Sequence, residues 1–104
     1  RLEALDATAL RLLTKFDNGH EIGAEPSMLK LKGSQLVQDM DRMLYEIVGY
    51  LALPQDSTMR EGGPAGAKIA DMVASGLFHH RGYTIAGGTS EIQHNIIAQQ
   101  VLGL

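Results

Sequence analysis

Cysteine is absent from this chain of 104 residues, and no segment of it is a long uninterrupted apolar run. Without cysteine the fold has no disulfide framework and no thiolate metal site, which fits a reducing compartment such as the bacterial cytoplasm or the mitochondrial matrix. A membrane helix needs roughly 20 apolar residues in succession, and charged residues or glycine interrupt every candidate. The N-terminal residues also lack the basic region and apolar core of a signal peptide.

An excess of charge of one sign is missing as well. Acidic and basic residues are interspersed and give a formal net charge of -3, so no basic stripe could neutralise several phosphates, and nucleic acid is not an expected partner. With 44% hydrophobic and 20% charged residues, the composition is that of an ordinary globular protein. A single domain over residues 1–104 is therefore expected.

Apolar residues at steps of three and four predict the first helix, over residues 2–17. Its predicted apolar face consists of Leu2, Leu5, Ala9, Leu12, Leu13 and Phe16. Asn18 and Gly19 follow this pattern, and both residue types tolerate the left-handed conformation that often ends a helix. The sequence therefore predicts the end of the helix at residue 17.

A second and longer helix is predicted after Pro26. Proline disfavours helix at the preceding Glu25, so Ser27 is expected to cap the new helix. Gly33 interrupts the apolar pattern and suggests a close helix crossing there. The apolar positions predicted to form the core are Leu29, Leu36, Val37, Met40, Met43, Leu44, Ile47, Val48 and Leu51.

The rest of the chain contains a loop and two further predicted helices. Pro, Gly, Ser and Asp without periodicity indicate a loop over residues 54–66, followed by a third helix over residues 65–78 whose end Gly76 would fray. Ser90 and Gln93 have the spacing of a capping box at the start of the last helix, and Gly103 fits the position just past its end. Since no strand pattern occurs, the predicted fold is all-α, an up-down four-helix bundle.

The turn before the last helix is the segment whose chemistry stands out. Ala-Gly-Gly-Thr-Ser-Glu, residues 86–91, combines two adjacent glycines with two hydroxyl side chains at a helix start. Such a turn exposes unpaired backbone N–H groups at the positive end of a helix dipole, and glycine lets a ligand approach the backbone closely. The pattern favours binding of an anion or another acceptor group, although a plain helix cap would look the same.

Residues 83–104 read Y-T-I-A-G-G-T-S-E-I-Q-H-N-I-I-A-Q-Q-V-L-G-L. This segment closely resembles the C-terminal signature of acyl-CoA dehydrogenases, typically I-Y-[EG]-G-T-S-E-I-Q-R-N-I-I-A-x-x-x-L-G. The preceding order of helix, loop, proline, long helix and glycine-containing turn also fits the C-terminal bundle of that family. By this resemblance, the chain is expected to be the C-terminal helical domain of a longer flavoprotein.

Members of this family bind FAD and oxidise an acyl-CoA thioester to the trans-2-enoyl-CoA. A carboxylate removes the α-proton while the β-hydrogen leaves as hydride to the flavin. The resemblance implies that Thr89, Ser90 and Glu91 contact FAD, with Gln93 as a further candidate, and that the backbone of Gly88 lies beside the acyl-CoA. It also implies an electron-transfer acceptor and a dimer or tetramer, built from one or two kinds of subunit.

Gly87 stands where many members of the family carry the catalytic glutamate. Because glycine has no proton-accepting side chain, no catalytic residue is assigned to this chain, and Gly87 is expected only beside the substrate. Some branches that read G-G-T at this turn place the glutamate on an earlier helix, which here would lie upstream of Arg1. Two alternatives remain open: a non-catalytic subunit or assembly module of a heteromeric enzyme, and a related flavoprotein with another substrate.

A second departure from the family occurs at the end of the long helix. Members commonly carry a Gln followed by a Gly-Gly-x-Gly turn that reaches the FAD of a neighbouring subunit. The best match here is E-I-V-G-Y, residues 46–50, in which only Gly49 persists as a cofactor-binding candidate. The carboxylate of Glu46 would face the cofactor's phosphates unfavourably unless it turns away.

Histidines close to the glycine turn are candidate metal ligands or acid-base groups. His79 and His80 are adjacent and have no carboxylate at helical spacing, so no metal site is expected. Arg81 could bind a phosphate or form an ion pair. His94 replaces the arginine that usually follows Ile-Gln in the family, so an ion pair expected there could become pH-dependent, or His94 could simply be solvated.

Overall fold

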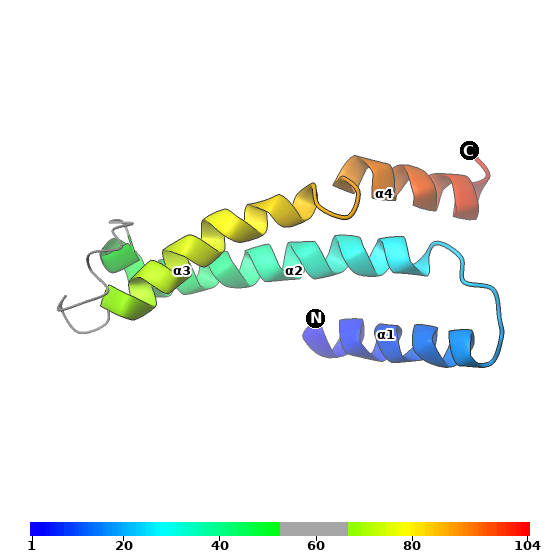
Figure 1. The fold of residues 1–104 in the computed structure, drawn as a ribbon, viewed down its shortest axis with the longest axis horizontal. Coiled ribbons are helices and arrows are strands. Elements are labelled where there is room, and N and C mark those ends of the chain that lie inside the picture. Colours follow the sequence, from blue (N-terminus) through cyan, green and yellow to red (C-terminus); the bar gives the residue numbers. More distant parts are fainter. Residues whose placement is uncertain (53–66) are drawn as a thin grey trace. The chain divides into compact units, whose positions relative to one another are not determined.

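The computed structural model describes residues 1–52 and 67–104, and within these ranges the chain contains helices and no strand (Figure 1). The α-helices are α1 (Leu2–Asp17), α2 (Glu25–Val48), α3 (Ala67–His79) and α4 (Ser90–Ile97). Shorter helical segments are η1 (Gly49–Ala52), η3 (His80–Thr84) and η4 (Ala98–Leu102). The all-α prediction with four helices is confirmed, whereas the predicted loop over residues 54–66 lies outside the described residues.

The chain divides into two compact units. The first contains Arg1–Leu36 together with Thr84–Leu104, and the second contains Val37–Tyr83. The long helix α2 therefore contributes its N-terminal half to the first unit and its C-terminal half to the second.

Helix α1 has the bounds that the apolar pattern predicted. Its last turn closes with hydrogen bonds from the N–H of Asn18 to the carbonyl of Thr14 (3.1 Å) and from the N–H of Gly19 to that of Phe16 (2.9 Å). Gly19 has a φ of 71°, the left-handed conformation expected where a helix ends. The local signals were sufficient here because they depend on neighbouring residues alone.

Helix α2 begins at Glu25, so the prediction that Ser27 caps it is wrong. Pro26 lies in the first turn, where its missing N–H costs no intrahelical hydrogen bond, and Ser27 is buried one residue further on. The carboxylate of Glu25 lies 2.6 Å from the ammonium of Lys15 on α1. Hydrogen bonding to Lys15 lowers the pKa of Glu25 below its ordinary 4.5.

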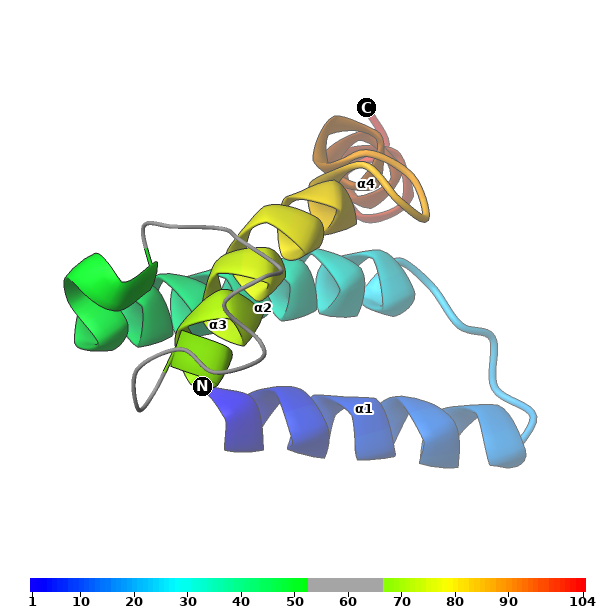
Figure 2. The same ribbon diagram turned by 60° about the vertical axis from the view of Figure 1, so that its left-hand side comes forward.

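Within the first unit, α1 runs antiparallel to the N-terminal half of α2 (Figure 2). A Cβ added to Gly33 would lie 3.8 Å from Cδ2 of Leu5, so α1 does pass this glycine. That separation is an ordinary van der Waals contact. The crossing predicted at Gly33 therefore occurs, but it leaves room for a methyl group.

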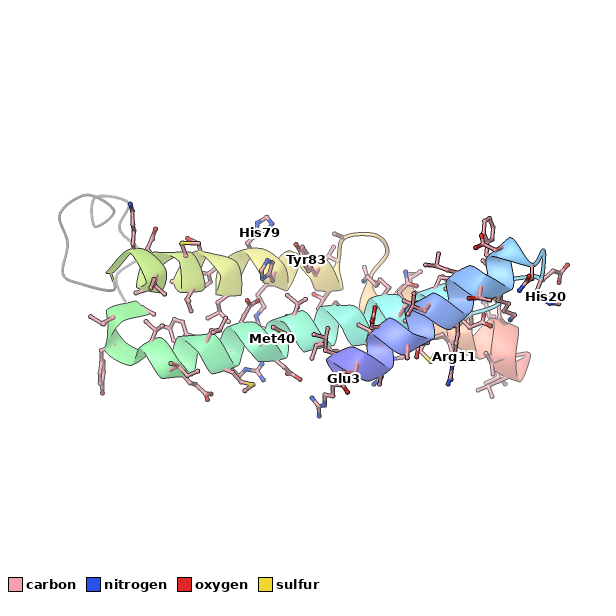
Figure 3. All side chains as sticks on the ribbon, turned by 90° about the horizontal axis from the view of Figure 1, so that it is seen from below. Glu3, Arg11, His20, Met40, His79 and Tyr83 are labelled. Carbon is pink, nitrogen blue, oxygen red and sulfur yellow. The ribbon has the colours of Figure 1, made fainter. Side chains whose placement is uncertain are left out.

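Within the second unit, α3 runs alongside the C-terminal half of α2 (Figure 3). Ala70 and Ala74 of α3 are fully buried, and Ala52 of η1 is nearly so. Helix α3 continues through Gly76 to His79, so the prediction that Gly76 frays its end is wrong. A Cβ at Gly76 would make only ordinary contacts with Asp41 and His80, which shows that neighbouring side chains cover this stretch of helix.

Most large apolar side chains of α2 are not buried among the described residues. Met40, Met43, Leu44 and Ile47 of α2 and Leu51 of η1 are exposed, Ile47 by as much as 78%, so the prediction that they form a core of this chain is wrong. The buried apolar residues of the described ranges are Leu31 and four alanines. A stripe of this kind is typical of a surface that another part of an assembly covers. Among the described residues, no helix has the length and apolar character needed to cross a membrane.

Candidate functional site: the glycine turn before α4

The backbone of the turn requires its two glycines. Gly87 has a φ of 70° and Gly88 a φ of 91°, both in the left-handed region that residues with a Cβ rarely adopt. A Cβ at Gly88 would lie 2.7 Å from Nε2 of Gln93, whereas a Cβ at Gly87 would meet nothing within 4 Å. The two glycines therefore face different surroundings: Gly88 is packed against a side chain and Gly87 borders open space.

Thr89 caps helix α4. Its Oγ1 accepts a hydrogen bond from the N–H of Ile92 at 3.3 Å, and its carbonyl accepts one from the N–H of Gln93 at 3.0 Å. The predicted capping box of Ser90 with Gln93 is therefore wrong by one residue. Ser90 is already helical, and its hydroxyl donates instead to the carbonyl of Thr84 at 3.4 Å.

Two side chains bind the carbonyl groups of the turn. The amide Nε2 of Gln93, a buried residue, donates to the carbonyl of Gly87 at 3.0 Å. The ammonium of Lys30, which comes from the N-terminal half of α2, donates to the carbonyl of Gly88 at 2.6 Å. Both consecutive peptide carbonyls thus have a side-chain donor. By contrast, the N–H of Thr89 takes part in none of the hydrogen bonds found among the described residues, whereas the N–H of Gly88 closes the hydrogen-bonded turn over residues 85–87.

The carboxylate of Glu91 brings a negative charge to the start of α4. Its pKa lies below the ordinary 4.5 because two groups donate hydrogen bonds to the carboxylate. The largest cause is the backbone N–H of Glu91 itself, and the next is the hydroxyl of Thr89. His94 and Lys30 add smaller electrostatic contributions in the same direction. Glu91 is therefore ionised at neutral pH and lies within electrostatic reach of the Lys30 ammonium.

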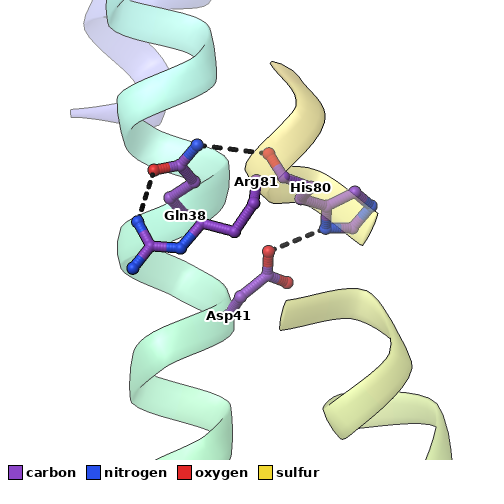
Figure 4. Close-up of polar contacts among 4 residues, drawn as sticks. All are labelled: Gln38, Asp41, His80 and Arg81. Carbon is purple, nitrogen blue, oxygen red and sulfur yellow. Dashed lines mark hydrogen bonds and ion pairs between the residues drawn. The ribbon is translucent and has the colours of Figure 1, made fainter. Parts of the chain in front are cut away.

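A separate polar cluster in the second unit anchors the start of η3 (Figure 4). Nδ1 of His80 lies 2.7 Å from Oδ2 of Asp41, and Nε2 of Gln38 donates to the carbonyl of His80 at 3.1 Å. The other end of the Gln38 amide accepts a hydrogen bond from Arg81 at 3.5 Å. This contact of Arg81 is with an amide, and the expectation that Arg81 binds a phosphate or forms an ion pair stays a prediction.

The ring of His80 in this cluster packs against the rings of His79 and Tyr83. The ring of His80 lies 4.9 Å from that of Tyr83 and 5.6 Å from that of His79, measured between centroids. In the part of the chain that the structure describes, no group of three or more potential metal ligands comes together. His94 is exposed, and its Nδ1 lies 2.7 Å from the carbonyl of Ser90 on the preceding turn of α4.

The structure brings most of the predicted site residues together. Gly87, Gly88, Thr89, Ser90, Glu91 and Gln93 all belong to the glycine turn and the start of α4. Gly49 belongs to the other unit, where it begins η1 with a φ of 59°, and Glu46 is exposed in the last turn of α2.

Sequence reasoning missed three side chains that anchor these segments: Lys30, Gln38 and Asp41. Lys30 is 58 residues from its partner Gly88, and Asp41 is 39 residues from His80. Periodicity and capping patterns report only near neighbours, and one lysine on a polar helix face looks like any other. No local signal could have identified these contacts.

A family model described as the acyl-CoA dehydrogenase C-terminal domain matches residues 1–102 of the chain. The match includes both units and the whole glycine turn. No curated protein and no solved structure matches the chain.

Proposed function

Because the chain belongs to the acyl-CoA dehydrogenase family, in which it matches the C-terminal domain, we propose that it contacts FAD and acyl-CoA in a flavoprotein that oxidises acyl-CoA thioesters to 2-enoyl-CoA. The observation that carries the proposal is the glycine turn. Its carbonyl groups are bound within the protein, while the N–H of Thr89 takes part in none of the hydrogen bonds found among the described residues.

The donors of this turn fit an oxygen-rich cofactor. The backbone N–H of Thr89, at a helix start and next to the hydroxyls of Thr89 and Ser90, suits a phosphate or ribityl oxygen of FAD. Glu91 opposes a phosphate held directly at this helix end, because its ionised carboxylate already occupies the positive end of the dipole. The fit is therefore best for neutral hydroxyl oxygens near Glu91, with any phosphate nearer Gly88 and the cation of Lys30.

The division of roles follows from this arrangement. Bound FAD would accept the hydride from the β-carbon of the thioester. The backbone of Gly88 would border the acyl-CoA, while Thr89, Ser90 and Glu91, with Gln93 beside them, would hold the flavin nucleotide. Gly49, in the other unit, is a further proposed contact to FAD. The residues of this chain thus bind and orient the two reactants.

The general base is proposed to lie outside the glycine turn. Gly87 occupies the position of the usual glutamate, and no side chain fills the space beside it within 4 Å. General-base catalysis contributes typically 10² to 10⁴-fold, so another carboxylate must face the α-carbon if the enzyme turns over. We propose that an earlier helix of the same bundle supplies this carboxylate.

The exposed apolar residues of α2 support a role in assembly. Met40, Met43, Leu44 and Ile47 lie on consecutive turns and are all exposed among the described residues. Burying them against other parts of a dimer or tetramer would stabilise the assembly by roughly 25 cal/mol for each Å² of apolar surface removed from water. Oligomerisation, with an electron-transfer acceptor as the external partner, completes the proposed function.

One assay on the full-length protein tests this function. The purified protein should show flavin absorbance, and anaerobic addition of acyl-CoA thioesters of different length and branching should bleach it. Protein without flavin would contradict the proposal. The upstream carboxylate, once located, should be essential: its Glu→Gln variant should keep FAD and lose bleaching.

A second candidate function also rests on Gly87. Because Gly87 supplies no base, the chain could belong to a non-catalytic subunit that binds FAD beside a catalytic partner subunit. Flavin that no thioester reduces, followed by reduction once a partner subunit is added, would favour this second function. A flavoprotein with another substrate would bind FAD and stay oxidised under both conditions.

A further inference from the structure

Two side chains from different helices hold consecutive peptide groups of the glycine turn. Gln93 of α4 donates to the carbonyl of Gly87 at 3.0 Å, and Lys30 of α2 donates to the carbonyl of Gly88 at 2.6 Å. Glycine has the greatest backbone freedom of all residues, so two adjacent glycines make a turn that is costly to order. These two hydrogen bonds restrain the backbone of the turn, one from a side chain six residues away and the other from a side chain 58 residues away.

Holding a carbonyl also orients the N–H of the same peptide group. The described residues contain no cis peptide bond, and in a planar trans peptide the carbonyl and the N–H of the next residue point in opposite directions. When Gln93 binds the carbonyl of Gly87, the N–H of Gly88 points away from Gln93. When Lys30 binds the carbonyl of Gly88, the N–H of Thr89 points away from Lys30.

We propose that Lys30 is a positioning residue for the glycine turn: its ammonium binds the Gly88 carbonyl and thereby directs the Thr89 N–H toward the ligand. Gln93 holds the preceding peptide group of the turn through the carbonyl of Gly87. The identity of the ligand, FAD beside an acyl-CoA, rests on the proposed function. The orientation of the turn does not, because it follows from contacts within this chain.

Lys32 shows why Lys30 is more than one surface cation among several. The ammonium of Lys32 reaches only Gln35 of its own helix, at 3.4 Å, and the side chain is exposed. The ammonium of Lys30 spans two helices, makes the shorter contact and lies near enough to Glu91 to help lower the pKa of that carboxyl. A hydrogen bond from an ionised donor is roughly twice as strong as one between neutral groups. The two lysines therefore form a matched pair with equal charge and unequal contacts.

The test compares Lys30→Met, Lys30→Arg and Lys32→Met in the full-length protein. The first measurement is the hydrogen-exchange rate of the peptide covering residues 87–95, taken on flavin-free protein. The second is the Kd for FAD together with the absorbance spectrum of the bound flavin. Lys30→Met should speed exchange severalfold, raise the Kd about tenfold and shift the flavin spectrum. Lys30→Arg should restore most of each value, and Lys32→Met should leave all three near wild type.

The outcomes separate the positioning role from the proposed function. If wild-type protein binds no flavin, the proposed function fails, and hydrogen exchange alone still decides the role of Lys30. Equal effects of Lys30→Met and Lys32→Met would overturn the proposal in favour of a general charge effect, and unchanged exchange in Lys30→Met would also overturn it. Should Lys30→Met not fold, the same comparison is made between Lys30→Gln and Lys32→Gln, with the same results expected in weaker form.

Discussion

Side chains of α2 bind both the glycine turn and the start of η3. The two sites differ in which hydrogen-bonding groups stay without a partner among the described residues. At η3, Gln38 uses both ends of its amide, and Asp41 pairs with the ring of His80. At the glycine turn, side chains bind the carbonyls of Gly87 and Gly88, while the N–H of Thr89 takes no part in the hydrogen bonds found among the described residues.

This difference distinguishes a structural anchor from a binding surface. A polar cluster whose groups pair with one another stabilises local structure and offers little to a ligand. A turn whose carbonyls are bound and whose Thr89 N–H bonds to no described residue can donate a hydrogen bond to an oxygen of a ligand. The proposed site therefore lies at the glycine turn, although the polar cluster of Gln38, Asp41, His80 and Arg81 carries more titratable groups.

The largest effect is expected from Gly88→Ala compared with Gly87→Ala. At Gly88 a methyl group would displace the Gln93 amide from 2.7 Å, removing its hydrogen bond and adding strain at a φ of 91°. We expect a loss of about 2–3 kcal/mol in the free energy of unfolding. Gly87→Ala meets no neighbour and should cost about 1–2 kcal/mol, from backbone strain alone. Urea unfolding of both variants measures the difference, and equal losses would show that Gln93 does not restrain the turn.

The next effect concerns the anchor at η3. Asp41→Asn removes the charge that pairs with His80 and should lower the free energy of unfolding by about 1–2 kcal/mol, since both side chains are partly buried. Its Kd for FAD should stay within about twofold of wild type, because a loss under 0.4 kcal/mol is expected at a site it does not anchor. Isothermal titration with FAD checks this, and a tenfold weaker Kd would contradict the separation of the two anchors.

A smaller effect is expected from Thr89→Val. This variant removes the cap of α4 and should cost about 1 kcal/mol. It also removes the second-largest cause of the lowered pKa of Glu91, so that pKa should rise toward 4.5. Because the folded pKa is depressed, the stabilisation from ionised Glu91 is fully present above pH 4.5 and disappears as the pH falls through the folded pKa. Unfolding of wild type and variant measured from neutral pH downward should show a weaker acid dependence in Thr89→Val, and parallel curves would contradict the assignment.

The smallest effect is a stabilisation. Gly33→Ala should raise the free energy of unfolding by about 0.5–1 kcal/mol, because alanine favours helix and the added methyl meets Leu5 at an ordinary 3.8 Å. Gly76→Ala, where the methyl would lie 3.6 Å from a carboxylate oxygen of Asp41, should gain less. A destabilised Gly33→Ala in thermal unfolding would show that the crossing is tighter than the structure describes.

Local features of the fold were predictable from the sequence, and contacts between helices were not. The bounds of α1 followed from its apolar spacing and the Asn-Gly pair, and the left-handed Gly103 followed from its place after the last helix. The cap of α4 was missed by one residue because Thr89 and Ser90 both carry a capping hydroxyl, and geometry decides between them. The start of α2 was missed because the preference against helix before proline is only a tendency. Glu25 is helical here, and its carboxylate binds the ammonium of Lys15.

The candidate site divides in the same way. The glycines, hydroxyls and carboxylate of the turn were visible as a contiguous motif. The hydrogen bonds from Lys30 and Gln93 to the carbonyls of the turn were not predicted. A lysine 58 residues from the turn has no spacing relation to it. The exposure of the apolar stripe on α2 was also missed, because apolar periodicity indicates which face will be buried without indicating what buries it.

The Kd for FAD of the full-length Gly88→Ala variant, measured beside Asp41→Asn, tests the central claim most directly. We expect Gly88→Ala to weaken FAD binding at least about tenfold, which is about 1.4 kcal/mol, and Asp41→Asn to leave it nearly unchanged. Wild-type affinity in Gly88→Ala, or an equal loss in both variants, would contradict the claim that the glycine turn is the flavin-binding surface of this domain.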